Sequence, residues 1–470
     1  IFLIAANDGQ LIESWRRLKD TEYVIKARKV FEDLLVEDRQ EQPGVRLRFF
    51  NLSRGSSVEL FDRAIKSFLD HLGWQESFKI KAGENEAFGP KCPIRHNYEL
   101  LQSPLVESRL RSLLELCDHN GLHVPIRQIL LLLTNALLGH PDVKDHLMVP
   151  ADIPKILAAG SISKASLYNN IFGGNLSETR RQSITIFDYF DRFQIGYETS
   201  HRIDNILIFG DSHETLHTYF KQLVVDDQFY GADERYSTAK CQYIEGDDED
   251  QDKGKDFLQL LISQRRGLFF KIPKEVEDEL NLWELTVFKF AGEYLSSVVD
   301  KLRNGGIVKR PILSRIVKGL NRIFTGMLVN SDREIFLATS GNYSQAKISR
   351  IFVDKISVDP NQGEKIILKY DSSTGRVILA VYLSPSIIEE LVLDLIKYEF
   401  LSRIALEGAL PTSFSKECYE GILAFKSKLL AAYERRQIQD GASMSANLEL
   451  KILTLSEEGF PMDRFIEVIQ

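Results

Sequence analysis

Cysteine is scarce in this chain, and no long apolar run is present. The four cysteines lie far apart and form no C-x-x-C pair, which argues against a disulfide framework and favours a reducing compartment. The longest apolar run, residues 129–138, is about half of the roughly 20 residues that a membrane-spanning helix needs. Because no signal peptide is visible either, we expect a cytoplasmic protein that does not enter a membrane.

A phosphate-binding loop motif is also missing. No G-x-x-x-x-G-K-[ST] occurs in the 470 residues, so they contain no such loop to surround phosphates with backbone N–H groups. The composition, 44% hydrophobic and 27% charged, is that of a globular protein with about two to four domains. The net charge of −8 argues against a surface covered by nucleic acid and leaves room for a local basic site.

The opening residues, 1–6, are all apolar and predict a strand buried on both faces, as in a parallel sheet covered by helices. Such sheets place polar, ligand-facing residues where a strand ends, and here that residue is Asn7. Asn7-Asp8-Gly9 is also an ordinary turn sequence, so this alternative stays open. Because a buried strand is an implausible natural start, we expect that a further part, with the phosphate-binding loop, precedes it.

The following pattern predicts helices around 11–18 and 27–35, a second strand at 45–52, a helix at 57–72 and then only helices to residue 138. Pro125 and Gly139 mark the two ends of the last of these helices. Arg127 falls in its first turn, where a cation opposes the helix dipole by about 0.3–1 kcal/mol and therefore often meets an anion. A surface ion pair with a carboxylate such as Glu115 is the alternative.

Residues 301–331 contain no acidic residue but several cations. Within this run, a helix opened by Pro311 is expected to carry a basic face backed by apolar residues, which suits the phosphate backbone of DNA. A solvated helix face is the alternative. The cations assigned to DNA are Lys309, Arg310, Arg315, Lys318 and Arg322.

Two patterns resemble metal sites. His213-Glu214-x-x-His217 matches H-E-x-x-H, which on a helix presents two zinc ligands and a general base. Residues 210–212 look like a helix cap, however, which would leave His213 at a frayed start, so exposed helix residues are the alternative. A second set lacks the compact spacing of a zinc finger, and we assign no metal ligand to it. This second set comprises Cys92, His96, Cys117, His119 and His123.

The chain order predicts six segments. Residues 1–82 are expected to end a sheet domain, 83–150 to form a helical lid, and 151–244 a helical middle domain, of winged-helix type as one option. The acidic tract 245–256 is expected to be a linker, and 257–330 a helical region with the basic face. In the α+β segment 331–470, we expect strands at 334–338, 349–357, 364–370, 375–383, 448–453 and 463–469, and helices at 384–406 and 415–436.

The order strand, helix, strand and small helical bundle resembles the end of a P-loop ATPase core of the AAA+ or STAND type. The runs 395–420, 195–199 and 203–207 resemble bacterial ATPases of phage-defence loci, in particular the ATPase subunit of DNA phosphorothioation-dependent restriction systems. This resemblance implies the C-terminal part of an α/β ATPase core with a helical lid, then a helical region and a mixed α+β domain. It also implies ATP and Mg²⁺ as cofactors, with double-stranded DNA, other defence subunits and further copies of the chain as partners.

The resemblance gives roles to three residues. Asn7 resembles the catalytic sensor that orients the attacking water, and Arg127 resembles the second sensor, which binds phosphate. Arg54 resembles an arginine finger that neutralises charge on a transferring phosphoryl group, but the finger of the family usually precedes this strand, so a solvated loop arginine is the alternative. The expected function is ATP hydrolysis coupled to conformational change on DNA. A zinc metalloprotease and a non-catalytic interaction subunit with a relict nucleotide fold are the alternatives.

Overall fold

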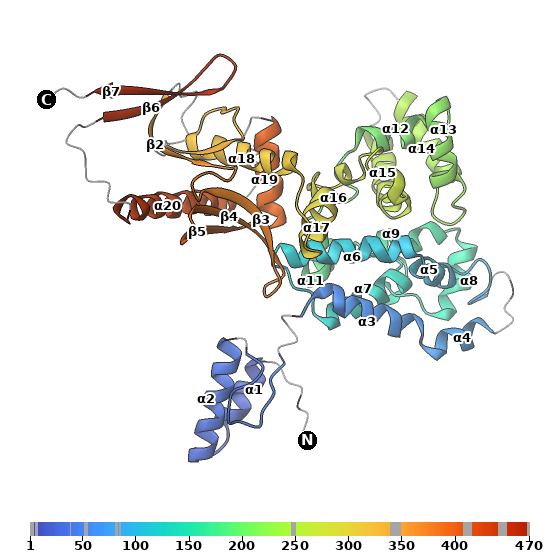
Figure 1. Ribbon diagram of the computed structural model, residues 1–470. Helices are drawn as coiled ribbons and strands as arrows, with labels where there is room; N and C mark the ends of the chain where they lie inside the picture. The colour runs from blue at the N-terminus through green and yellow to red at the C-terminus, as the bar shows by residue number, and fades with distance from the viewer. Residues whose placement is uncertain are drawn as a thin grey trace.

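The computed structural model describes residues 4, 8–37, 39–50, 55–79, 83, 86–245, 251–338, 349–407, 416–439 and 449–467. This part of the chain mixes helices with antiparallel sheet, which confirms the α+β component of the expected fold class. In chain order, an N-terminal helix pair is followed by a large helical body and a region that carries two sheets (Figure 1). None of the described helices combines the length and the apolar character needed to cross a membrane.

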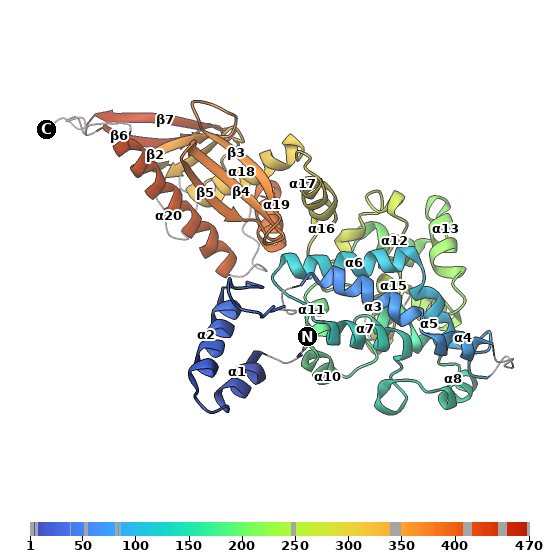
Figure 2. The ribbon, with the colours of Figure 1, turned by 60° about the horizontal axis from the view of Figure 1, so that its bottom comes forward.

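The N-terminal helix pair consists of α1 (Asp8–Arg16) and α2 (Glu22–Val36), which confirms the two helices expected there. Thr21 begins α2 by accepting a hydrogen bond from the backbone N–H of Val24. The pair stands apart from the helical body in both views (Figure 1, Figure 2).

The strand predicted at 45–52 is wrong over its described part. Residues 45–50 contribute only an isolated antiparallel bridge, between Glu41 and Arg48. A strand needs a neighbour to satisfy its backbone groups, whereas here the chain folds back on itself and Phe49 packs edge-on against Phe31, with ring centroids 5.9 Å apart. Ile4 lies outside any strand and is 75% exposed. The described residues before 57 therefore contain no sheet, and the rest of 1–7 lies outside the described residues.

The helical body contains both long helices and short connecting ones. Its α-helices are α3 (Ser57–Leu69), α4 (Leu72–Phe78), α5 (Pro93–Leu101), α6 (Pro104–His119), α7 (Ile126–Leu138), α8 (Ile153–Ala158), α9 (Leu167–Asn170), α10 (Glu178–Ser183), α11 (Thr185–Asp191), α12 (His201–Phe209), α13 (Glu214–Phe220), α14 (Glu234–Glu245), α15 (Gln251–Lys271), α16 (Ala291–Glu293) and α17 (Asp300–Arg303). The 3₁₀-helices are Lys144–His146, Pro150–Asp152, Ile162–Ala165, Lys274–Val276 and Leu282–Leu285, and the π-helices are η5 (Lys221–Val225) and η8 (Tyr294–Val299).

The expected segment boundaries differ from those of the structure in three places. Helix α3 packs against α6 and α7, so it belongs to the helical body rather than to a sheet domain at 1–82. Residues 151–244, all of them described, contain no strand and so no wing of a winged helix. Residues 251–256 of the acidic tract are helical, and α14 and α15 pack together, with the ring of Phe257 5.5 Å from that of Tyr236. The tract thus connects two neighbouring helices rather than two domains.

The described residues of the C-terminal region form two antiparallel sheets and three helices. One sheet has the order β1-β2-β6-β7 and the other the order β3-β4-β5. Helix α18 packs on α19 and β1, while α20 packs on β4 and β5 (Figure 1). The elements are α18 (Arg310–Thr325), β1 (Glu334–Ala338), β2 (Ser349–Ser357), β3 (Lys365–Asp371), β4 (Arg376–Ser384), β5 (Ile387–Val392), α19 (Leu395–Glu407), α20 (Lys416–Gln439), β6 (Glu449–Leu455) and β7 (Pro461–Glu467).

All six strands predicted in this region are confirmed, but the helix predicted at 384–406 is wrong in its first half. Residues 387–392 form β5, which pairs antiparallel with β4. Ser384 begins this hairpin, because its hydroxyl accepts the backbone N–H groups of Ser386 and Ile387. The helix α19 starts only at Leu395.

Candidate functional site

The predicted sensor and finger residues are only partly described. Asn7 and Arg54 lie outside the described residues. Arg127 is exposed in the first turn of α7, which begins directly after Pro125, as the sequence predicts. The alternative ion pair with Glu115 is not formed, since Glu115 pairs with Arg303 instead. Within the described part of the chain, the Arg127 side chain makes no hydrogen bond or ion pair, so its charge is open to solvent.

A hollow of about 360 Å³ lies between α3 and α7, and Ile126, the residue before Arg127, lines it. Ile126 and Leu130 line it from α7, and both are 43% exposed. Arg63 lines it from α3. The lining thus combines two exposed apolar side chains with one arginine.

The segment before α3 enters the helical body close to this surface. The backbone N–H of Ser57 donates to Asp118 at 2.8 Å, and the Ser57 hydroxyl accepts the backbone N–H of Val124 at 2.9 Å. Val124 precedes Arg127 by three residues. Polypeptide that precedes Ser57 therefore approaches the body at the end where Arg127 is exposed.

The predicted basic face divides into engaged and free cations. Arg310 pairs with Asp359. Arg315 pairs with Glu293 and donates to the hydroxyl groups of Tyr398 (2.9 Å) and Ser402 (3.1 Å). These contacts join α18 to α16 and α19, and so give Arg315 a structural role.

The three remaining cations of the face differ from one another. Arg322 donates to the backbone carbonyl of Ile404 at 2.6 Å, and burial lowers its pKa. Lys309, which precedes α18, is exposed, whereas Lys318 is half-buried. Burial, followed by the charge of Arg322, lowers the pKa of Lys318. Neither lysine side chain makes a hydrogen bond or an ion pair within the described residues, so the face open to DNA is smaller than the sequence indicates.

The H-E-x-x-H pattern does not have the geometry of a zinc helix. His213 is the residue before α13, and its Nδ1 lies 3.0 Å from the hydroxyl oxygen of Thr215. His217 and Glu214 are exposed on α13. Among the described residues, no group of three His, Cys, Asp or Glu side chains is placed to hold a metal ion, in this segment or around Cys92 and Cys117.

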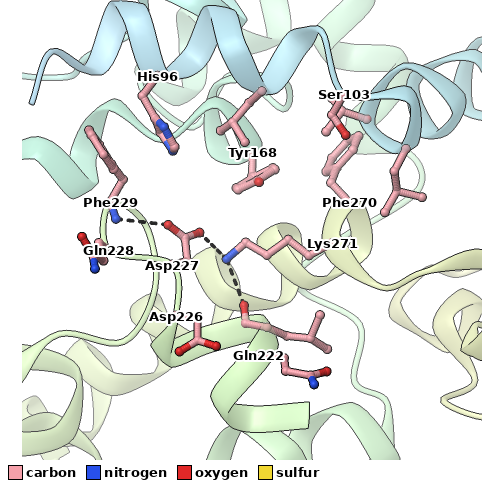
Figure 3. A pocket seen from close by; sticks show the side chains of 14 residues that line it. His96, Ser103, Tyr168, Gln222, Asp226, Asp227, Gln228, Phe229, Phe270 and Lys271 are labelled. Atoms are coloured by element: carbon pink, nitrogen blue, oxygen red, sulfur yellow. Dashed lines mark hydrogen bonds and ion pairs between the residues drawn. The ribbon is translucent and has the colours of Figure 1, made fainter. Parts of the chain in front are cut away.

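A second hollow, larger than the one between α3 and α7, was not predicted. It has a volume of about 540 Å³ and lies where α5, the start of α6, α9, η5 and the end of α15 meet (Figure 3). This volume is within the usual range for ligand pockets, about 300–1,000 Å³. Four rings, of His96, Tyr168, Phe229 and Phe270, contribute to its walls.

A buried ion pair forms the floor of this pocket. Lys271 Nζ lies 2.5 Å from Asp227 Oδ2 and donates to the carbonyl of Leu223 at 3.1 Å. Asp227 Oδ1 accepts the backbone N–H groups of Phe229 (3.1 Å) and Tyr230 (2.9 Å). Leu223 belongs to the π-helix η5, and such helices occur frequently at functional sites.

The environment lowers three pKa values in this pocket. Burial raises the pKa of Asp227, but the Lys271 ammonium and the backbone N–H groups outweigh burial, so the net shift is downward. Burial lowers the pKa of Lys271 although Asp227 opposes the shift. Burial also lowers the pKa of His96, whose ring is stacked on Phe229 at a centroid distance of 3.8 Å. We therefore expect a neutral His96 imidazole beside the Asp227–Lys271 ion pair, whose two charges cancel.

Comparisons of the chain with models of protein families, with curated proteins and with solved structures found no match. The structure itself shows a fold of the α+β class.

Proposed function

We propose that this chain is the lid-bearing part of an ATPase that acts with partner subunits on DNA in bacterial phage defence. In this proposal, the surface between α3 and α7 faces a bound nucleotide, and Arg127 contacts its phosphates. The 470 residues contain no phosphate-binding loop motif, so the proposal requires another segment or another chain to supply that loop, the contacts to Mg²⁺ and most contacts to ATP.

The observation that carries the proposal is Arg127 at the start of α7, which is exposed and has no partner among the described residues, next to apolar residues and to the entry of the chain into α3. A nucleotide-binding domain packed on this surface would cover Ile126 and Leu130. The same packing would bring Arg127 to an anion, which would offset the unfavourable dipole interaction of a cation in a first turn.

The test is ATP hydrolysis by the full-length protein with Arg127→Ala. A charge-assisted hydrogen bond is worth about 1.5–3 kcal/mol, so we expect ATP affinity or turnover to fall about tenfold or more. Arg235→Ala is the matched control, because Arg235 is an exposed arginine on α14. Equal ATP affinity and turnover in wild type and Arg127→Ala would refute the role of Arg127.

A non-catalytic interaction subunit is the second candidate. The observation in its favour is that residues 45–50, the described part of an expected strand of the nucleotide-binding sheet, contribute only an isolated bridge. Titration of ATP into the full-length protein separates the two candidates. Saturable ATP binding supports the ATPase, whereas no binding, with partner assembly intact, supports the interaction subunit.

A further inference from the structure

The pocket in Figure 3 is lined by polar side chains that have no partner among the described residues. Ser103, Gln222, Asp226 and Gln228 line it, and within the described residues their side chains make no hydrogen bond or ion pair. They come from the start of α6, from η5 and from the loop after η5. Four polar groups that line one hollow without bonding one another are suited to hydrogen bonds with a ligand.

The charge of the pocket determines the kind of ligand. Its one lysine, Lys271, is neutralised by Asp227 and also bonded to the Leu223 carbonyl. Asp226 is exposed and makes no ion pair with any residue that the structure describes, so it supplies the net charge that a ligand would meet. An anionic ligand would be repelled by Asp226 and would find no free cation in the lining. A cationic ligand would gain a carboxylate partner.

The aromatic walls favour the same class of ligand. Ring faces carry partial negative charge and attract ammonium and guanidinium groups. The pocket already contains one such contact, because Lys271 Nζ lies 5.3 Å from the ring centroid of Tyr168. The stacked rings of His96 and Phe229 also belong to the wall.

We propose that this pocket binds a small organic cation that carries a primary amine. Asp226 serves as its counter-ion, the Gln222, Gln228 and Ser103 side chains accept its N–H groups, and the rings enclose its carbon chain. The site is separate from the proposed nucleotide surface, because no residue that lines this pocket also lines the hollow between α3 and α7. It also depends on different residues, so either proposal can fail alone.

The test is calorimetric titration of the full-length protein with putrescine, a diamine, and with butanediol, its uncharged analogue. We expect putrescine to bind in the millimolar range or tighter, with weaker binding at higher salt, and butanediol not to bind. Asp226→Asn should weaken putrescine binding about tenfold, which corresponds to about 1.4 kcal/mol. The matched control is Asp278→Asn, since Asp278 is an exposed aspartate outside the pocket.

Three results would overturn the proposal. These are no putrescine binding by the wild type, equal binding of putrescine and butanediol, or equal putrescine affinity in wild type and Asp226→Asn. A melting curve of Asp226→Asn that matches the wild type excludes unfolding as the cause of lost binding. Because the carboxylate is exposed and makes no bond inside the described part of the protein, we expect the two curves to coincide.

Discussion

Replacing Arg315 by methionine separates a structural role of this cation from a role in DNA contact. The Arg315 guanidinium pairs with Glu293, donates to Tyr398 and Ser402, and stacks over the Phe290 ring at 4.6 Å. Its side chain is 15% exposed, so most of these contacts are shielded from water. Methionine keeps part of the apolar contact and removes all the hydrogen bonds.

The expected loss of stability follows from these contacts. A hydrogen bond to a charged group contributes about 1.5–3 kcal/mol. Glu293 is 33% exposed, and water will restore part of its solvation in the variant, so we expect a total loss of about 2 kcal/mol. In a cooperative unit of about 150–250 residues, this lowers Tm by roughly 4–8 °C.

The assay is thermal unfolding of Arg315→Met beside Lys318→Met. Lys318 lies on the same helix and makes no ion pair within the described residues, so its loss should change stability by about 0.5 kcal/mol or less. A double-mutant cycle with Glu293→Gln should give a coupling of about 1 kcal/mol. If Arg315→Met has the same Tm as the wild type but no longer binds DNA, the structural role of Arg315 is refuted.

Two further predictions concern pH and DNA. Burial, with Arg303 adding to it, lowers the pKa of His119 from 6.5 to about 4. The unfolded state therefore takes up this proton more readily, and up to about 3 kcal/mol of stability is lost as pH falls from 6.5 to about 4. In urea unfolding, His119→Gln should make stability depend less on pH over this range. The control His217→Gln, at an exposed histidine, should leave the pH dependence unchanged. Reversing both Lys309 and Lys318 to glutamate should reduce the slope of log K against log salt for double-stranded DNA by about 2. An unchanged slope would remove both lysines from the proposed DNA surface.

Periodicity and boundary residues predicted much of this fold. Pro125 and Gly139 bracket α7, and Pro311 lies in the first turn of α18. The apolar side of α18 is buried, with Ile312 and Leu320 nearly inaccessible to water, as its spacing predicts. Such signals are local, so they can be detected in a single sequence.

The wrong secondary-structure predictions concern segments whose structure depends on residues distant in sequence. Residues 387–392 contain two glutamates and follow Ser384-Pro385, which resembles a helix start, yet pairing with β4 makes them a strand. Residues 45–50 alternate like a strand, but among the described residues their one bridging partner is Glu41, at Arg48. The sequence of either segment alone therefore does not predict whether it forms a strand.

The pocket could not be predicted for the same reason. Asp227 and Lys271 are distant in sequence, and no motif spacing connects them with His96 on α5. The acidic pair Asp226-Asp227 followed by Phe229-Tyr230 was the only local signal. In the predicted basic face, sequence spacing does not reveal that Arg315 and Arg322 are engaged by α19.

Hydrogen exchange of the full-length protein, with and without ATP and Mg²⁺, tests the central claim most directly. If the α3–α7 surface faces the nucleotide, ATP should slow amide exchange in residues 60–70 and 126–131, and Arg127→Ala should reduce this protection. ATP binding without any change in these two segments would contradict the account.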